Sequence, residues 1–337
     1  MAGPQVDYCA SVSATRATTR RTPLVAGVDL GGTKIQTVVL RKGEVAGSAR
    51  VLTPRTGVAV DVIAAIVGTV RTSLESAGAT DGALAAVGIG TPGEIDVEAG
   101  AVLLAANVPG FSERVELGPL VSELVDGVEV KVGNDVSVGV LGEFSRGAGK
   151  PFRNVLGVWV GTGVGGGLIL DGELLDGRGA GGEVGHMVVE PGGLRCPCGR
   201  RGCLEAYAGR LAMERRARRL VKRGRKTELF SIMKKQGRTS LSSGVYARAL
   251  KRGDKLTKKL IDDAVWALGI GLASAQNLLD LEAIVIGGGL GDRLGQPFVD
   301  RIVEAMEPHL FAHAPTVLRT ELGDLSGAVG AAVLAGG

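Results

Sequence analysis

Two distant segments of the chain repeat one order of strand, glycine turn and strand. The strands and turns are residues 24–30, 31–33 and 34–40 in the first copy, and 155–160, 161–163 and 164–170 in the second. A third apolar piece follows each copy, at 45–52 and 173–175, and helical patterns and another strand come later. The duplication predicts an α/β protein whose two domains face one another across a cleft, each with a glycine turn pointing inward.

The two turns, Gly31-Gly32-Thr33 and Gly161-Thr162-Gly163, have the composition of a phosphate clamp. Backbone N–H groups in such turns form anion-binding concavities, and glycine lets the chain approach a polyphosphate closely. Thr33 and Thr162 can add hydroxyl donors. Asp29, at the end of the first strand, is better suited to hold magnesium, through water. Tight packing also produces such turns. Each turn leads into a strand, which distinguishes both turns from Walker and Rossmann loops.

A third glycine run, Gly287-Gly288-Gly289, follows the apolar strand 283–286. A helical pattern over 258–279 delivers that strand. Glycines at this position suit a nucleoside that lies flat on the backbone. A plain β-turn is an equally good interpretation of this run alone.

Asn134-Asp135 stands at a strand end and opens a helical pattern that continues through Phe144. Asn-Asp is an ordinary helix N-cap signal. Beside a phosphate clamp it predicts something more, because phosphoryl transfer to an alcohol needs a carboxylate that accepts the hydroxyl proton. Asp135 is the candidate base, and Asn134 and Asn107 can hydrogen-bond a polyol.

Three of the four cysteines and one of the three histidines fall within residues 186–203. Three thiolates and an imidazole, from Cys196, Cys198, Cys203 and His186, are the ligand set of a closed structural zinc site. A redox pair or a disulfide is the alternative. No apolar signal-peptide core follows Met1, which argues against secretion. The remaining Cys9 is interpreted as a free thiol.

Charge and composition narrow the classes of partner. Residues 1–23 predict a disordered basic arm. The basic run 214–226 is typical of a solvated helix face, and the 3% aromatic content disfavours a nucleic-acid groove. No apolar run approaches the roughly 18 residues of a membrane span. We expect a cytoplasmic protein that binds neither nucleic acid nor membrane.

Jointly, these motifs resemble the ROK-family sugar kinases of the actin-like, hexokinase-type ATPase superfamily, and are most similar to its bacterial ATP-dependent glucokinases. The matching segments are 29–34, 134–135, 183–186, 196–205 and 327–333. The resemblance implies two actin-like (ribonuclease H-like) domains, 24–135 and 136–337, that flank an ATP/sugar cleft and carry a structural zinc at 186–203. The last helix is expected to pack back on the N-terminal domain.

The resemblance also implies residue roles. The hexose would be surrounded by Asn107, Asn134, Asp135, Glu183, His186 and Glu205, with His186 serving both zinc and sugar. ATP would lie against Asp29, Gly31, Gly32, Thr33, Lys34, Gly161, Thr162, Gly163, Gly287, Gly288 and Gly289. A homodimer or homotetramer is implied too. The expected reaction is ATP- and magnesium-dependent phosphorylation of glucose at its 6-hydroxyl.

The proteins that the chain resembles include other functions, and the residues of the chain bear on each of them. N-acetylglucosamine, N-acetylmannosamine, mannose or fructose are alternative substrates that the spacing does not separate. The family name also covers sugar-responsive repressors with a helix-turn-helix module. Only 28 residues precede Asp29, and they lack helical periodicity, so a repressor is the weaker prediction. Kinases of this family that use polyphosphate lack the cysteine cluster, which disfavours that reading.

Overall fold

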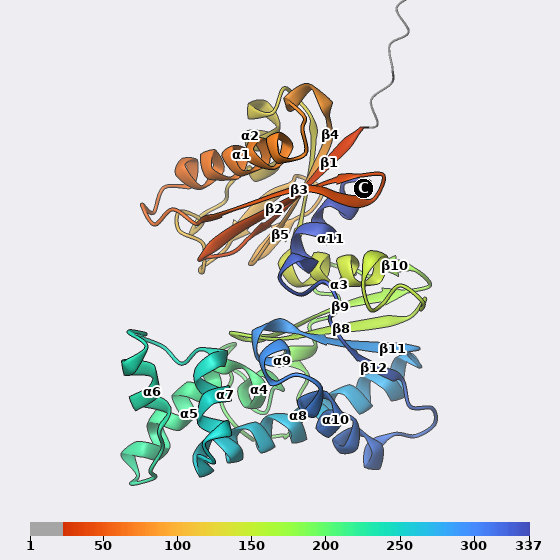
Figure 1. The fold of residues 1–337 in the computed structure, drawn as a ribbon. Coiled ribbons are helices and arrows are strands. Elements are labelled where there is room, and N and C mark those ends of the chain that lie inside the picture. Colours follow the sequence, from red (N-terminus) through yellow and green to blue (C-terminus); the bar gives the residue numbers. More distant parts are fainter. Residues whose placement is uncertain (1–22) are drawn as a thin grey trace, which may run out of the picture.

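The computed structural model describes residues 23–337, which form two stacked lobes (Figure 1). Each lobe is built on a five-stranded sheet. The predicted basic arm, apart from Pro23, and Cys9 lie outside the described residues.

The N-terminal sheet has the strand order β3-β2-β1-β4-β7. Its strands are β1 (Leu24–Leu30), β2 (Lys34–Arg41), β3 (Glu44–Leu52), β4 (Leu84–Thr91) and β7 (Glu129–Asn134). The first three form an antiparallel meander, and β4 and β7 run parallel to β1. The first glycine turn is therefore the tip of the β1–β2 hairpin.

The C-terminal sheet repeats this topology in the order β10-β9-β8-β11-β12. Its strands are β8 (Val155–Val160), β9 (Val164–Leu170), β10 (Glu173–Leu174), β11 (Ala283–Gly287) and β12 (Thr316–Arg319). Again three antiparallel strands are followed by two parallel ones. The duplication predicted from the glycine turns is confirmed, and the second turn is the tip of the β8–β9 hairpin.

Two helices, α1 (Ala59–Ser76) and α2 (Leu117–Leu124), cover the outer face of the N-terminal sheet. The apolar residues of α1 recur every three or four positions, from Val62 to Leu74, and are buried against the sheet. A short 3-10 turn η1 (Asp81–Ala83) and a small hairpin of β5 (Glu94–Asp96) and β6 (Ala101–Leu104) complete this lobe.

The outer face of the C-terminal sheet carries a larger helical layer, visible at the bottom of Figure 1. Its elements are η2 (Val184–His186), α4 (Glu205–Ala208), α5 (Arg210–Lys222), α6 (Leu229–Lys235), α7 (Ser243–Lys251), α8 (Lys255–Leu279), α9 (Gly288–Leu294), α10 (Gln296–Met306) and η3 (Glu307–His309). The helix expected from residue 258 begins at Lys255, because the Asp254 side chain accepts the Thr257 N–H at 2.7 Å and caps it. The basic run of 214–226 lies mostly on α5, whose Ala217 faces the core.

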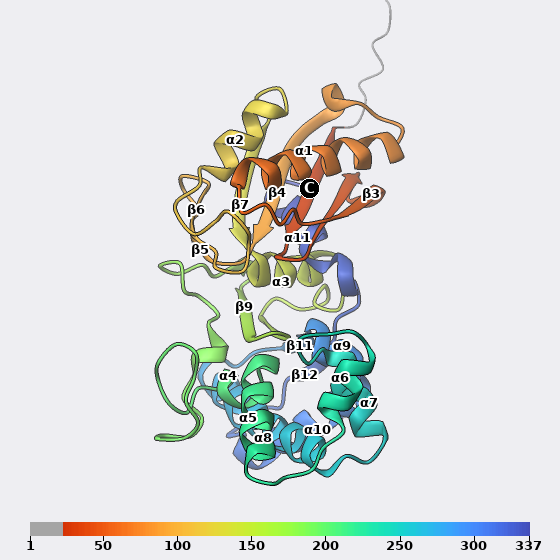
Figure 2. The same ribbon diagram turned by 90° about the vertical axis from the view of Figure 1, so that its left-hand side faces the viewer.

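Two further helices, α3 (Asp135–Arg146) and α11 (Ser326–Leu334), lie between the sheets (Figure 2). Helix α3 packs on the inner face of the C-terminal sheet, and α11 packs on the N-terminal sheet. They cross where a Cβ on Gly330 would lie only 1.6 Å from the Val138 carbonyl oxygen. Glycine at this position lets the two connections between the lobes touch.

Glu143, on α3, ties this crossing together. The residue is 1% exposed, and its Oε1 accepts hydrogen bonds from the Leu322 N–H at 2.9 Å and the Ser326 hydroxyl at 2.8 Å. Its Oε2 accepts from the Ala148 and Glu321 N–H groups. A buried carboxylate with four donors links α3 to η4 (Gly323–Leu325) and α11, so the chain segments that join the lobes are held as one unit.

Across residues 23–337, no helix combines the length and the apolar character needed to cross a membrane.

Candidate active site

The first glycine turn is held open by its own backbone and by β3. The Gly31 N–H donates to the Lys34 carbonyl at 3.0 Å, and the Thr53 hydroxyl donates to the Gly31 carbonyl at 2.6 Å. A Cβ on Gly32 would lie 2.0 Å from the Asn107 carbonyl oxygen. Only glycine lets the loop that carries Asn107 rest on this turn, so the structure brings a predicted sugar residue beside the predicted phosphate residues.

The second glycine turn is attached to the start of α5. The Arg210 and Leu211 N–H groups donate to the Gly161 and Thr162 carbonyls, both at 3.1 Å. Glu205 lies directly behind the turn, because its Oε2 accepts the Val164 N–H at 3.0 Å. One carboxylate oxygen of this predicted sugar ligand is thus already used to hold the phosphate turn, which leaves the other for a substrate.

The third glycine run does not form the plain β-turn that was the alternative interpretation. Gly287 ends β11, and Gly288 and Gly289 begin α9, so the run is the junction of a strand and a helix and no β-turn forms. Gly288 has φ +80°, and a Cβ there would lie 2.8 Å from the Val160 amide nitrogen. The run therefore packs against the end of β8, next to the second turn.

A cavity of about 210 Å³ lies where the lobes meet, above α9 and beside the start of α3. Among the predicted residues, it is lined by Asp29, Lys34, Asp135, Gly288 and Gly289. The carboxyl group predicted to act on the hydroxyl and the one predicted to hold magnesium thus share one cavity. Gly31, Gly32, Thr33, Gly161, Thr162, Gly163 and Gly287 are not among its lining residues.

The electrostatics of this cavity concentrate negative charge. Burial raises the pKa of Asp29 to about 6, and the nearby charge of Asp135 adds to the shift. Burial also raises the pKa of Asp135, while the hydrogen bond from the Val136 N–H lowers it. Two shielded carboxyl groups that face one another favour a divalent cation between them and a phosphate. Lys34 lines the same cavity and pairs with Asp324 at 3.2 Å.

Sequence reasoning missed several lining residues. Asp292, Thr320, Asp324 and Ser326 face the same cavity, and Thr320 donates to Asp292 at 2.8 Å. They come from α9 and from the segment between β12 and α11. The only sequence signal was the position of Asp292 four residues after Gly288, one helical turn along α9.

A second, smaller cavity of about 60 Å³ lies on the other side of Asn134. Asn134 and Glu183 line it, together with Asp176 and the β5 hairpin residues Ile95 and Val97. The Asn134 Oδ1 accepts the Val136 and Ser137 N–H groups, so this residue does cap α3. Its amide N–H₂ group remains available to donate to a ligand in the cavity. Asn107, His186 and Glu205 line neither this cavity nor the larger one.

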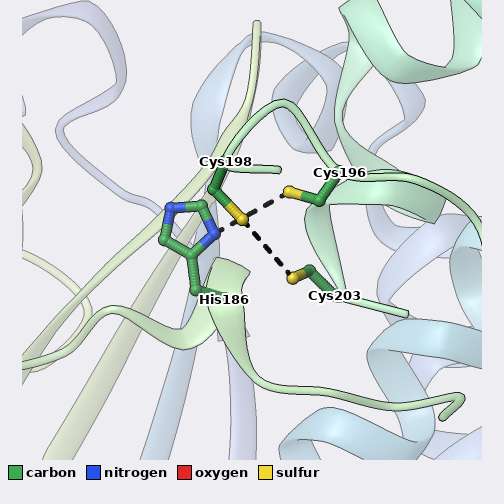
Figure 3. Close-up of side chains that lie close together, drawn as sticks. All are labelled: His186, Cys196, Cys198 and Cys203. Atoms are coloured by element: carbon green, nitrogen blue, oxygen red, sulfur yellow. Dashed lines mark hydrogen bonds between the residues drawn. The ribbon is translucent and has the colours of Figure 1, made fainter. Parts of the chain in front are cut away.

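The predicted metal ligands converge, as Figure 3 shows. One ligand atom each from His186, Cys196, Cys198 and Cys203 lies within 4.8 Å of the other three. The Sγ atoms of Cys198 and Cys203 are 3.8 Å apart, and Cys196 Sγ is 3.9 Å from His186 Nδ1. Zn–S bonds of roughly 2.3 Å in a tetrahedron require sulfur atoms about 3.8 Å apart, whereas a disulfide requires about 2 Å. The arrangement fits zinc and excludes a formed disulfide.

The predicted zinc ligands lie next to two of the predicted sugar ligands, Glu183 and Glu205. Glu183 Oε2 is 3.9 Å from His186 Nε2, and Glu205 Oε1 is 3.9 Å from Cys196 Sγ. A Cβ on Gly202, which has φ +81°, would lie 1.8 Å from the Glu190 carbonyl oxygen, so glycine allows the cysteine loop to fold over the preceding strand-like segment. The cluster therefore fixes the two carboxylates relative to one another.

Comparison with known proteins decides the family. The profile of the ROK family matches residues 25–337. The chain belongs to the ROK family. It is 34% identical to a glucokinase from Streptomyces coelicolor, over 93% of this chain and 97% of that protein. It is 32% identical to a kanosamine kinase from Amycolatopsis mediterranei, over 94% of this chain and 97% of the other.

A solved structure supports the same assignment. The ROK family glucokinase from Streptomyces griseus, crystallised with glucose and AMPPNP, superposes with a TM-score of 0.75 and 33% identity, over 93% of this chain and 99% of that one. The two-domain actin-like α/β fold predicted from the sequence is thereby confirmed.

Asp29 gives a prediction about stability. A carboxyl group whose folded pKa is raised binds its proton more tightly in the folded state, so its contribution to stability is greatest below about pH 3.8 and is lost as the pH rises through about 6. We expect Asp29→Asn to raise the free energy of unfolding by about 1 to 3 kcal/mol at pH 8, and by less toward pH 5. Urea titrations without magnesium or nucleotide measure this.

Asp61→Asn is the matched control, because Asp61 is exposed on α1. Equal free energies of unfolding for wild type and Asp29→Asn at pH 8 would show that the buried Asp29 carboxylate does not destabilise the fold. The argument that its buried position serves cation binding would then fail.

Proposed function

We propose that the protein is an ATP- and magnesium-dependent kinase that phosphorylates glucose at its 6-hydroxyl. The observation that carries the proposal is the joint position of Asp29 and Asp135 at the junction of two glycine-turn domains. One wall of the larger cavity offers backbone and cationic groups suited to polyphosphate. The start of α3 separates it from a small polar cavity suited to a hydroxylated ligand.

The proposed base is Asp135, at the first position of α3. Its raised pKa brings the carboxylate nearer to the working pH, where proton acceptance from a hydroxyl is more favourable. Asn134 fixes the backbone at this point by capping the helix, and its N–H₂ group can orient the sugar. When bound, ATP supplies the phosphoryl group and magnesium neutralises the charge on it.

The nucleotide ligands proposed are the residues of the three glycine segments with Asp29, Thr33, Lys34 and Thr162. Lys34 lies at the cavity, where its ammonium can exchange Asp324 for a phosphate oxygen. Asp29 would hold magnesium through water, since a direct contact between its carboxylate and phosphate is repulsive. Zinc at the His186–cysteine cluster would have a structural role only, because four protein ligands leave no open position.

The remaining sugar ligands proposed are Asn107, Glu183, His186 and Glu205. Of these, Glu183 lines the small cavity, His186 and Glu205 lie at the cysteine cluster, and Asn107 lies at the first glycine turn. Glu183 and the free Oε1 of Glu205 can accept hydrogen bonds from adjacent hydroxyls of a hexose. The cavity that Glu183 lines measures only about 60 Å³, so the bulk of an acetamido group favours glucose above the N-acetylhexosamines.

The deciding experiment is a coupled ADP-release assay with ATP and magnesium over glucose, mannose, fructose, N-acetylglucosamine and N-acetylmannosamine. We expect the highest kcat/KM on glucose. A better value on another hexose would reassign the substrate and keep the kinase, whereas no ADP release with any sugar would refute the proposed function.

A prediction on specificity follows from Glu183. Removing the sugar 2-hydroxyl leaves one carboxylate unpaired, and a hydrogen bond to a charged group contributes about 1.5–3 kcal/mol. Because the Glu183 side chain is 54% exposed, water replaces part of the lost bond. We expect 2-deoxyglucose to have about tenfold lower kcat/KM than glucose, and Glu183→Gln to reduce that ratio. If the ratio of kcat/KM for glucose to that for 2-deoxyglucose is the same in wild type and in Glu183→Gln, Glu183 does not bind the 2-hydroxyl.

A further inference from the structure

Arg210, the first residue of α5, lies at the second glycine turn but has no part in the proposed site so far. Its Nη2 donates to the Thr162 hydroxyl oxygen at 2.9 Å, and its Nη1 donates to the Ser243 hydroxyl at 3.1 Å. Its own N–H is bonded to the Gly161 carbonyl. The guanidinium is thus held by neutral groups at the end of the β8–β9 hairpin.

Within residues 23–337, Arg210 makes no ion pair, and the charge of Glu214 acts on it only from beyond contact distance. Its Nε is buried and has no hydrogen-bond partner. The nearest acid along α5, Glu214, is taken by Arg218 Nε at 3.0 Å and by the Leu241 N–H at 2.7 Å. Burial lowers the pKa of Arg210. A half-buried cation whose nearest acid is already bonded to other groups is typical of a site that takes an anionic ligand.

The position of Arg210 indicates which anionic ligand would bind beside it. Its two anchors reach the two glycine segments of the C-terminal lobe: Thr162 belongs to the second turn, and Ser243 Oγ is 3.3 Å from the place of a Cβ on Gly289. Gly289 lines the larger cavity. A polyphosphate between these segments would lie alongside the guanidinium.

The hydrogen-bond polarity matters as well. A hydroxyl has one proton, and Thr162 receives the Arg210 N–H on its oxygen. Its proton is then directed away from Arg210, where it can only be donated to another acceptor. Thr162 is thereby left as a donor to a group on the side of the turn away from Arg210.

We infer that Arg210 is a positioning residue for the polyphosphate of a nucleoside triphosphate, acting through Thr162 and through its charge. The inference rests on the proposed function for the identity of the anion. On this inference, the affinity of the second glycine turn for phosphate depends on Arg210, at the start of α5.

The test compares Arg210→Gln, Arg210→Lys and Arg219→Gln. Arg219 is exposed on the same helix and serves as the control. We expect Arg210→Gln to raise the Kd of AMPPNP about 10- to 100-fold, since a hydrogen bond to a charged group is lost. The affinity for adenosine and the KM for the sugar should stay near wild type, and Arg210→Lys should recover most of the loss.

A double-mutant cycle separates positioning from general damage. If Arg210 acts through Thr162, the losses caused by Arg210→Gln and Thr162→Val should not add in the double variant. Unchanged AMPPNP affinity in Arg210→Gln, or equal losses for AMPPNP, adenosine and sugar, would overturn the inference. If Arg210→Gln does not fold, an Arg210→Lys variant with weakened adenosine binding would overturn it too.

The AMPPNP titration requires no turnover, so its result is independent of the sugar assay. A wild type that binds AMPPNP but transfers phosphate to no hexose would refute the proposed function and leave Arg210 testable. A wild type that does not bind AMPPNP would refute the inference.

Discussion

Asp135→Asn is expected to reduce kcat for sugar phosphorylation by about 100- to 10,000-fold, the usual loss when a general base is removed. The amide has the same shape as the carboxyl group, so Asn134 can still cap α3 and the hydrogen bond from the Val136 N–H can form. The negative charge and, with it, the ability to accept a proton are lost. The measurement is kcat at saturating ATP and sugar, with circular dichroism to verify the fold.

Binding should survive the same substitution. We expect the Kd of AMPPNP and the affinity for the sugar to change by less than about tenfold, because the proposed anchors of both ligands are other residues. Asp61→Asn, on the far side of the N-terminal lobe, is the control for a lost carboxylate. Wild-type kcat in Asp135→Asn would show that another group takes the proton.

The pH profile supplies a second readout. A base must be deprotonated to act, so wild-type kcat/KM should fall as the pH drops through the pKa of Asp135, which burial raises above its ordinary value. Asp29 titrates near pH 6 in the same cavity, so the acid limb belongs to both carboxyl groups together. In Asp135→Asn the limb should reflect Asp29 alone.

The parts of the fold that the sequence predicted well are those with local causes. The hairpins around 31–33 and 161–163 follow from apolar strands that flank a glycine turn, and all of these residues are neighbours in the chain. The helix-capping role of Asn134 is local too, since the Oδ1 meets N–H groups two and three residues later. Sequence periodicity and turn chemistry suffice for such features.

The features that escaped prediction depend on partners far along the chain. Glu143 looked like one more polar residue of a helix, yet its carboxylate binds groups 178 to 183 residues away. Arg210 lies just ahead of the predicted basic run 214–226 and drew no prediction, yet its guanidinium contacts Thr162 and Ser243, which are distant in the chain. Composition and periodicity do not reveal that a single charged side chain is buried, because they do not show which distant part of the chain it contacts.

The cysteine cluster combines both kinds of information. Spacing alone selected His186 and the three cysteines, and the structure places their ligand atoms together. The sequence could not show that the cysteine loop also contacts Glu205, one of the residues proposed to bind the sugar. That connection runs from Cys196 to Glu205 at 3.9 Å, and from Glu205 to the Val164 N–H at the second glycine turn.

Cys198→Ser is accordingly expected to lose bound zinc and sugar phosphorylation together. About one zinc per chain should be found in the wild type, and close to none in the variant, because three ligands without the fourth hold a structural metal poorly and metal binding stabilises the folded loop. Cys198 is the exposed cysteine of the cluster, so the substitution leaves no cavity in the core. Elemental analysis and kcat/KM measure the two losses.

The size and direction of the activity loss follow from what the loop supports. Freed from the metal, η2 and the start of α4 can shift, and with them Glu183 and Glu205. Altered support of metal-site neighbours costs about 10- to 100-fold, and two carboxylates move here, so we expect kcat/KM for glucose to fall at least 100-fold, more through the KM of the sugar than that of ATP. Cys9→Ser, a cysteine outside the cluster, should change neither quantity. Full activity in zinc-free protein would refute the metal's role, since the carboxylates would then hold their places without it.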